Sequence, residues 1–251
     1  MVQITIIKIN DYGPWTLTLG SDREHELQML QASLYKEIQK LFSEKNCLAF
    51  LNKADEFFVI TNGLTLNDHI AIQKKLENLF DLKLSMSIGY ALTSFEANLK
   101  AYQGKKSNII LNKEHNIYGF VNGQAEQKVI ILHFDVEDLT SERKTKSPYE
   151  ISSSIFKLYS KMSEFFLQKN SLSFYMGGDN FIVIGNDDAK ENARQFISTV
   201  KKDLDFNLNC GIGIGKSARE AVKLATKSLD TIREIRDSGK EKSEIYEISC
   251  Y

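Results

Sequence analysis

An internal repeat with a spacing of 124 residues is the feature that most restricts the fold of this chain. Residues 84–89 (LSMSIG) align with residues 208–213 (LNCGIG), and two further pairs keep the same spacing, 93–97 with 217–221 and 51–55 with 175–179. A fourth pair, 7–10 with 132–135, matches with one residue of slip. Four matches in one order indicate a duplicated structural unit.

The pattern of each unit predicts the order strand, helix, strand, strand, helix, strand, followed by a closing helix. In the second half, β-branched and apolar runs indicate strands, and apolar residues at spacings of three and four indicate helices. The expected elements are strands at 128–135, 172–176, 181–184 and 206–214, and helices at 148–170, at 189–200 and from 217. This order predicts an α+β chain of two tandem ferredoxin-like, palm-type units, each an antiparallel sheet with helices on one face. We expect the first unit at residues 1–104, a connector at 105–127 and the second unit at 128–251.

Composition excludes several classes of protein. The 251 residues are 42% hydrophobic and 26% charged, which is typical of a globular chain rather than a disordered one. Lys and Arg number 32 against 33 Asp and Glu, so we expect neither a nucleic-acid partner nor a membrane partner. No apolar run nears the ~20 residues that span a bilayer, and the first residues lack the basic region of a signal peptide. The 3 scattered cysteines form no metal motif, and we expect a soluble, cytoplasmic protein.

The outer face of each sheet is expected to be open. Because side chains alternate along a strand, the apolar residues of 206–214 share one face, and Asn209, Gly211 and Gly213 share the other. Small side chains leave room for a ligand, so we expect a substrate above this strand. Lys216 follows it, just before an expected helix N-terminus that favours phosphate. Plain solvation of this face, with Lys216 a surface lysine, is the alternative.

Two carboxylates are the main candidates for a metal site. Asp135 closes an apolar strand, and Asp179 lies in the turn formed by Gly177, Gly178 and Asn180. In the ferredoxin-like order the first and third strands are neighbours, so the two carboxylates are expected to lie close together. Carboxylate and carbonyl oxygens suit Mg²⁺, and glycines let the backbone approach a phosphate. Ordinary turn chemistry, which also uses Asp, Asn and Gly, is the alternative.

Two further features are candidates for catalysis and binding. His133 shares a face with Asp135 and is a candidate acid or base, the alternative being a histidine whose hydrogen bonds are satisfied within the sheet. The segment YGPW, residues 12–15, follows the first strand and holds the one tryptophan of the chain. Tyr12 and Trp15 are candidates to wall a base-binding pocket by stacking, and an aromatic anchor for a turn is the alternative.

Four motifs in one order carry a resemblance to a known family. They are INDYGPW at residues 9–15, ITNG at 60–63, GGDNF at 177–181 and GIGIG at 211–215. Together, over nearly the whole chain, they resemble archaeal GTP cyclohydrolase III. The GGDN turn also resembles the GGDEF turn of diguanylate cyclases, although Asn180 stands in place of the acidic fourth residue.

The resemblance implies a Mg²⁺-dependent hydrolysis of GTP. Two Mg²⁺ ions at the carboxylate site are expected, because a pair of ions would clamp the attacking and leaving oxygens of a phosphoanhydride. The imidazole ring opens at C8, the formyl group is kept and two phosphates are released, which gives 2-amino-5-formylamino-6-(5-phosphoribosylamino)pyrimidin-4(3H)-one. The implied metal ligands are Asp135, Asp179 and the Val136 carbonyl. The expected catalytic residues are Asp135 and Asp179 together with His133, which its place beside Asp135 makes a candidate proton relay. The implied substrate contacts are Gly177, Gly178, Asn180 and Lys216 at the triphosphate, and Asn10, Tyr12, Trp15 and Asp55 at the guanosine. Asn10 stands where we expect an aspartate in the family.

Two rival functions remain open from the sequence. A nucleotidyl-cyclase-like enzyme would use the same palm, release pyrophosphate and leave the purine ring intact; Asn180 counts against it. A non-catalytic GTP sensor is the second rival, and the presence of both Asp135 and Asp179 counts against that. We also expect a homo-oligomer, because duplicated sheets often pair their faces between subunits.

Overall fold

The computed structural model describes residues 1–122, 128–137, 145–204 and 206–251. The end of the expected connector, 123–127, lies outside the described residues. The chain forms two compact units: one holds Met1–Leu92 and continues from Glu96, and the other holds Thr93–Phe95 and continues from Lys128. Residues 105–122, which the sequence assigns to the connector, belong to the first unit, where they complete a helix and add two strands. Within the described residues, no helix is long and apolar enough to cross a membrane.

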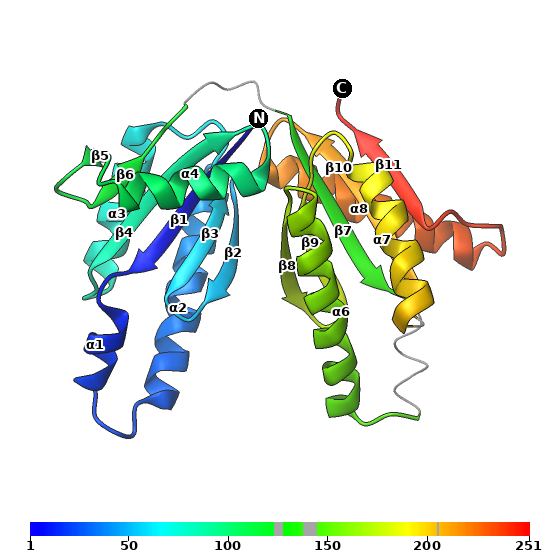
Figure 1. Cartoon of the computed structure of the whole chain (residues 1–251), viewed down its shortest axis with the longest axis horizontal. Helices are drawn as coiled ribbons and strands as arrows, with labels where there is room; N and C mark the ends of the chain where they lie inside the picture. Colours follow the sequence, from blue (N-terminus) through cyan, green and yellow to red (C-terminus); the bar gives the residue numbers. More distant parts are fainter. Residues whose placement is uncertain (123–127, 138–144, 205) are drawn as a thin grey trace. The chain divides into compact units, whose positions relative to one another are not determined.

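The first unit contains a six-stranded sheet in the order β2-β3-β1-β4-β6-β5 (Figure 1). Its strands are β1 (Val2–Ile9), β2 (Leu48–Lys53), β3 (Glu56–Ile60), β4 (Leu84–Ala91), β5 (Ile110–Asn112) and β6 (Ile117–Gly119). Its helices are α1 (Tyr12–Leu17), α2 (Glu24–Ser43), α3 (Leu66–Leu79) and α4 (Ser94–Lys106). Residues 12–15, expected to be a rigid aromatic segment, thus lie within a short helix.

The second unit contains a five-stranded sheet in the order β11-β10-β7-β9-β8 (Figure 1). Its strands are β7 (Val129–Val136), β8 (Leu172–Gly177), β9 (Asn180–Ile184), β10 (Leu208–Gly215) and β11 (Ile245–Ser249). Its helices are α6 (Pro148–Gln168), α7 (Ala189–Leu204) and α8 (Ala218–Asp237). In both units the four repeated strands lie in the order four-one-three-two, and their neighbours are antiparallel, so the predicted duplicated ferredoxin-like fold is confirmed. Each unit then adds a strand parallel to its fourth strand, β6 on β4 and β11 on β10.

One face of the second sheet carries the apolar core, as the alternation of side chains predicts. Leu132 and Phe134 on β7 pack with Cys210 and Ile212 on β10 against the buried sides of α6 and α7. Helix α6 begins with a capping box, in which Ser147 accepts a hydrogen bond from the Glu150 amide while the Glu150 side chain accepts one from the Ser147 amide. The same arrangement of sheet against helix forms the core of the first unit.

The opposite face of β10 is covered, so the expectation of an open face and of helices on one side only is wrong here. Helix α8 lies directly on the glycines of this strand. A Cβ added at Gly213 would stand 2.0 Å from the Ala221 carbonyl oxygen and 2.3 Å from the Ala225 amide nitrogen. The glycines therefore admit a closely packed helix rather than a substrate. Ala221 and Ala225, one turn apart on α8, are the sequence signal for this contact.

Candidate functional site

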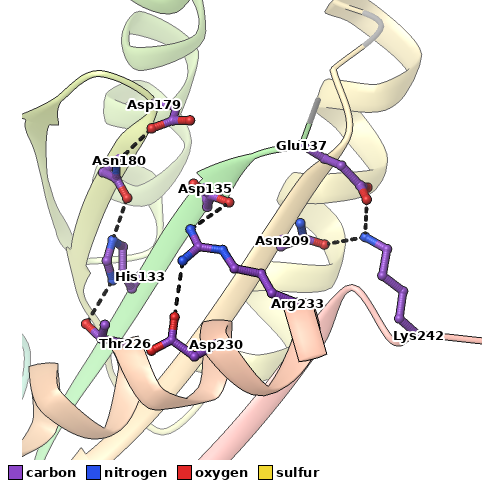
Figure 2. A network of polar contacts seen from close by, with 10 residues as sticks. All are labelled: His133, Asp135, Glu137, Asp179, Asn180, Asn209, Thr226, Asp230, Arg233 and Lys242. Carbon is purple, nitrogen blue, oxygen red and sulfur yellow. Dashed lines mark hydrogen bonds and ion pairs between the residues drawn. The ribbon is translucent and has the colours of Figure 1, made fainter. Parts of the chain in front are cut away.

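The predicted carboxylates meet at one end of the second sheet. Asp135 lies near the end of β7, and the strand register places it opposite Asn180 on β9 and Asn209 on β10. Asp179 stands in the turn immediately before Asn180, and its carboxylate accepts a hydrogen bond of 2.8 Å from the side-chain Nδ2 of Asn180 (Figure 2). Val136, the third expected ligand, ends β7 and is buried.

The turn that carries Asp179 needs its two glycines. Gly177 has a φ of 98° and Gly178 a φ of 63°, in the left-handed region that residues with a Cβ rarely adopt. No atom lies within 4 Å of a Cβ built at Gly177. The backbone here is therefore both strained for other residues and open to a ligand.

An arginine from α8 neutralises Asp135. The Arg233 guanidinium lies 3.2 Å from Asp135 Oδ2 and also pairs with Asp230 at 3.1 Å (Figure 2). Burial raises the pKa of Asp135, the nearby charge of Asp179 raises it further, and Arg233 opposes both effects. Two carboxylates with one adjacent arginine form a site that a bound cation would stabilise.

His133 is held in a defined orientation beside Asn180. Its Nε2 donates to the Asn180 side-chain oxygen at 3.0 Å if Nδ1 accepts from the Thr226 hydroxyl at 3.2 Å, an arrangement that suits a neutral ring. Burial lowers the pKa of His133, which also favours the neutral ring. The structure thus links Asp179, Asn180 and His133 by hydrogen bonds, and Asp135, paired with Arg233, lies on the strand position opposite Asn180 (Figure 2).

Several members of this network are missing from the sequence prediction. Lys242 bridges the Glu137 carboxylate at 2.6 Å and the Asn209 side-chain oxygen at 2.8 Å. Thr226, Asp230 and Arg233 come from α8, and their spacing of four and three residues places them on one helix face. That spacing could have identified one polar face of the helix from the sequence. Lys242, which lies outside regular structure, offered no such signal.

A cavity opens beside the glycine turn. It has a volume of about 400 Å³ and is lined by Lys146, Pro148, Ile151, Ser152, Ile155, Tyr175 and Gly178. It therefore lies between the N-terminus of α6 and the backbone of the turn. A helix N-terminus carries partial positive charge, so the position suits an anionic group.

Lys216 does not belong to this group. In the antiparallel register Leu208 pairs with Val136, whereas Gly215 pairs with Val129 at the opposite end of the sheet. Seven residues of strand separate the two ends by about 24 Å. Lys216 is exposed there, with its amine over the Tyr251 ring. The argument from a helix N-terminus failed because it ignored the direction of the strand.

The expected guanosine residues occupy separate surroundings in the first unit. Asn10 accepts hydrogen bonds from Ser85 and Lys105, and Asp55 pairs with Lys8 at 3.7 Å. Tyr12 accepts a hydrogen bond from Gln31, and its ring centroid lies 6.0 Å from that of Trp15. Among the described residues, a cavity of about 1140 Å³ in this unit is lined by Asn10 but not by Tyr12, Trp15 or Asp55.

No ready-made metal cluster is present in the described residues. Over these ranges, no three His, Cys, Asp or Glu side chains come together as a metal-binding group. Mg²⁺ does not require one, because it usually keeps several waters and takes one or two carboxylates together with substrate phosphates. Asp135 and Asp179 fit that requirement.

Known proteins resemble this chain along almost its entire length. The family model described as GTP cyclohydrolase III matches residues 1–244. A GTP cyclohydrolase III of Methanococcus maripaludis is 32% identical, covering 98% of this chain and 92% of that protein. That of Methanocaldococcus jannaschii is also 32% identical, covering 93% and 88%. Among solved structures, a bacterial light-regulated adenylyl cyclase matches with a TM-score of 0.40 and 14% identity, covering 94% of this chain and 83% of that one, a level that supports no conclusion. The chain belongs to the GTP cyclohydrolase III family.

Proposed function

We propose that this chain is a GTP cyclohydrolase of type III. It hydrolyses GTP to 2-amino-5-formylamino-6-(5-phosphoribosylamino)pyrimidin-4(3H)-one and releases two phosphates. The observation that carries the proposal is membership of the family over residues 1–244. The network around Asp135 and Asp179 supports it, because these are the carboxylates that the resemblance assigns to metal binding.

The proposed cofactor is Mg²⁺, held by Asp135, Asp179 and the Val136 carbonyl. Bound there, the metal would supply positive charge for the triphosphate and an activated water. The expected pair of ions stays a prediction. Asp135 suits this role because its carboxylate is buried beside the negative charge of Asp179, which Arg233 and, more weakly, His133 offset.

The side chains of the second unit have distinct proposed roles. Asp135 and Asp179 bind the metal, and Arg233 on α8 holds Asp135 in place. The cavity beside Gly178 receives a phosphate at the N-terminus of α6. His133 is kept neutral by burial, so one ring nitrogen can accept a proton during hydrolysis.

Mass spectrometry of the product tests the proposed reaction. The purified chain is incubated with GTP and Mg²⁺, and the nucleotide is weighed while inorganic phosphate is counted. We expect a monophosphate one water heavier than GMP and two phosphates per GTP. An intact purine with pyrophosphate would establish the cyclase-like reaction instead, and unchanged GTP that still binds would establish a sensor. The expected homo-oligomer stays a separate prediction, which sedimentation of the same preparation tests.

A further inference from the structure

The first unit has a large cavity on the sheet face that α2 and α3 leave uncovered. The α2 and α3 side packs against Ile7 and Ile9, whereas Lys8 and Asn10 point to the cavity. Helix α4 covers β4 on this side, since a Cβ added at Gly89 would stand 2.0 Å from the Ala97 carbonyl oxygen. It leaves β1 and β3 open, and the cavity of about 1140 Å³ lies there, large enough for a nucleotide.

The lining of this cavity is strongly basic. It includes five lysines, Lys8, Lys53, Lys83, Lys105 and Lys106, against two carboxylates, Asp11 and Glu56. Two of the lysines are already paired, Lys53 with Glu56 at 3.5 Å and Lys8 with Asp55 at 3.7 Å, so the other three face one further carboxylate, Asp11. The same lining contains the rings of Phe58, Tyr102 and Tyr118. A cavity with excess positive charge and aromatic walls suits a ligand that has both phosphates and a base.

Lys105 is the fixed cation of the cavity. Its amine donates to Asn10 Oδ1 at 3.1 Å and to the buried Ser85 hydroxyl at 2.5 Å. Both partners are neutral, and within the part of the chain that the structure describes no carboxylate pairs with this amine. Burial lowers the pKa of Lys105, the charge of Lys8 lowers it further, and Glu56 and Asp11 act in the opposite direction. An anion in the cavity would stabilise the charged amine.

The pairing of the strands shows which residues of the two units occupy equivalent positions. In the strand register Lys8 pairs with Ser85 and Glu56, and Asp135 pairs with Asn209 and Asn180. Lys8, and not Asn10 as the sequence match suggested, therefore stands at the position of Asp135. In the second unit two carboxylates, Asp135 and Asp179, offer oxygen ligands for a metal, with Arg233 beside them. In the first unit the equivalent residue is itself a lysine, and the nearby Lys105 amine adds a second positive charge. In the first unit, lysine side chains therefore supply the positive charge that a bound metal would supply in the second unit.

We propose that this cavity of the first unit binds a nucleoside polyphosphate without a divalent cation, its phosphates on Lys105 and the neighbouring lysines and its base against the aromatic rings. This goes beyond the proposed hydrolysis, which uses the carboxylates of the second unit. The ligand class follows from the combination of excess lysines, nearby rings and a lysine, Lys8, at the position of Asp135. Asp55, which aligns with Asp179, is paired with Lys8.

Calorimetry in EDTA tests the proposal on the full chain. GTP is titrated into the wild type, and inorganic tripolyphosphate is titrated separately. We expect one site per chain for GTP, tighter binding of GTP than of tripolyphosphate, and weakening of both as KCl is raised. Lys105→Gln should weaken both by about tenfold or more, because a hydrogen bond to a charged group is lost. Lys100→Gln, on the same helix but outside the lining, should bind as the wild type does.

The outcomes separate this cavity from the second unit. Binding in EDTA should persist in Asp179→Asn. Absence of GTP binding in EDTA, or equal affinity of Lys105→Gln and the wild type, would overturn the proposal. So would binding that is lost in Asp179→Asn and kept in Lys105→Gln. Equal affinity for GTP and tripolyphosphate would refute the role given to the rings. If Lys105→Gln does not fold, the salt dependence of the wild type still tests the proposal. An affinity that does not change with KCl would refute phosphate binding by the lysines.

Discussion

Substituting Gly213 by alanine should separate α8 from β10. The new Cβ would stand 2.0 Å from the Ala221 carbonyl oxygen and 2.3 Å from the Ala225 amide nitrogen, whereas ordinary contacts begin near 3.4 Å. Both obstructing atoms belong to a helix backbone, so no side-chain rotation can relieve the overlap. The helix must retreat by more than an ångström.

That retreat has an energetic cost and a functional one. Overpacking a core typically costs about 1–3 kcal/mol, and a rigid obstruction places this case at about 3 kcal/mol or more. A gap of that size also forfeits much of the dispersion energy of the buried residues on α8, among them Leu229 and Ile232. Because α8 carries Arg233 to Asp135, GTP turnover should fall together with stability.

Urea unfolding followed by far-UV circular dichroism measures the effect. Fluorescence would miss it, because the one tryptophan, Trp15, lies in the first unit. Gly13→Ala is the matched control, since no atom lies within 4 Å of its added Cβ. If Gly213→Ala unfolds at the same urea concentration as Gly13→Ala, the close packing of α8 on β10 is refuted.

Three further predictions address other parts of the molecule. Burial lowers the pKa of His69 to about 4, so the first unit should lose stability as pH falls from about 6.5 to about 4, by up to about 1.4 kcal/mol per pH unit. Trp15 fluorescence in urea measures it, and the loss between pH 6.5 and 5 should shrink in His69→Gln but not in His25→Gln. Ser147→Ala removes the α6 cap and should lower the unfolding free energy by about 1 kcal/mol in urea, while Ser153→Ala, on the exposed side of the helix, should not. EDTA should abolish phosphate release from GTP and added Mg²⁺ should restore it; turnover that persists in EDTA would refute the metal requirement.

The fold could be predicted because its determinants are local and repeated. The strand and helix periodicities and the aligned motifs define the order of elements, and the turn at Gly177 and Gly178 marks a hairpin. The sequence did not predict that α8 covers β10. The small side chains of Gly211 and Gly213 suggested space for a substrate, whereas that space is filled by the small residues of α8. That contact depends on the complementary shapes of β10 and α8, which neither segment shows alone.

The candidate site was predicted only in part for a similar reason. Asp135 and Asp179 follow from strand order, because neighbouring strands bring their ends together. Arg233 and Lys242 reach the site from segments about a hundred residues later in the chain, and the sequence does not show which groups such long, flexible side chains contact. Lys216 was misplaced because a helix N-terminus near the end of β10 lies at the wrong end of the antiparallel pair.

The most direct test compares GTP turnover in two aspartate variants of the second unit. Asp179→Asn removes the charge from the glycine turn, whereas Asp187→Asn removes an exposed carboxylate that pairs with Lys128. The account predicts that kcat falls more than about a hundredfold in Asp179→Asn, because removing a charged group that stabilises the transition state costs about that much, and stays close to the wild-type value in Asp187→Asn. Wild-type turnover in Asp179→Asn would contradict the assignment of the catalytic metal site to this turn.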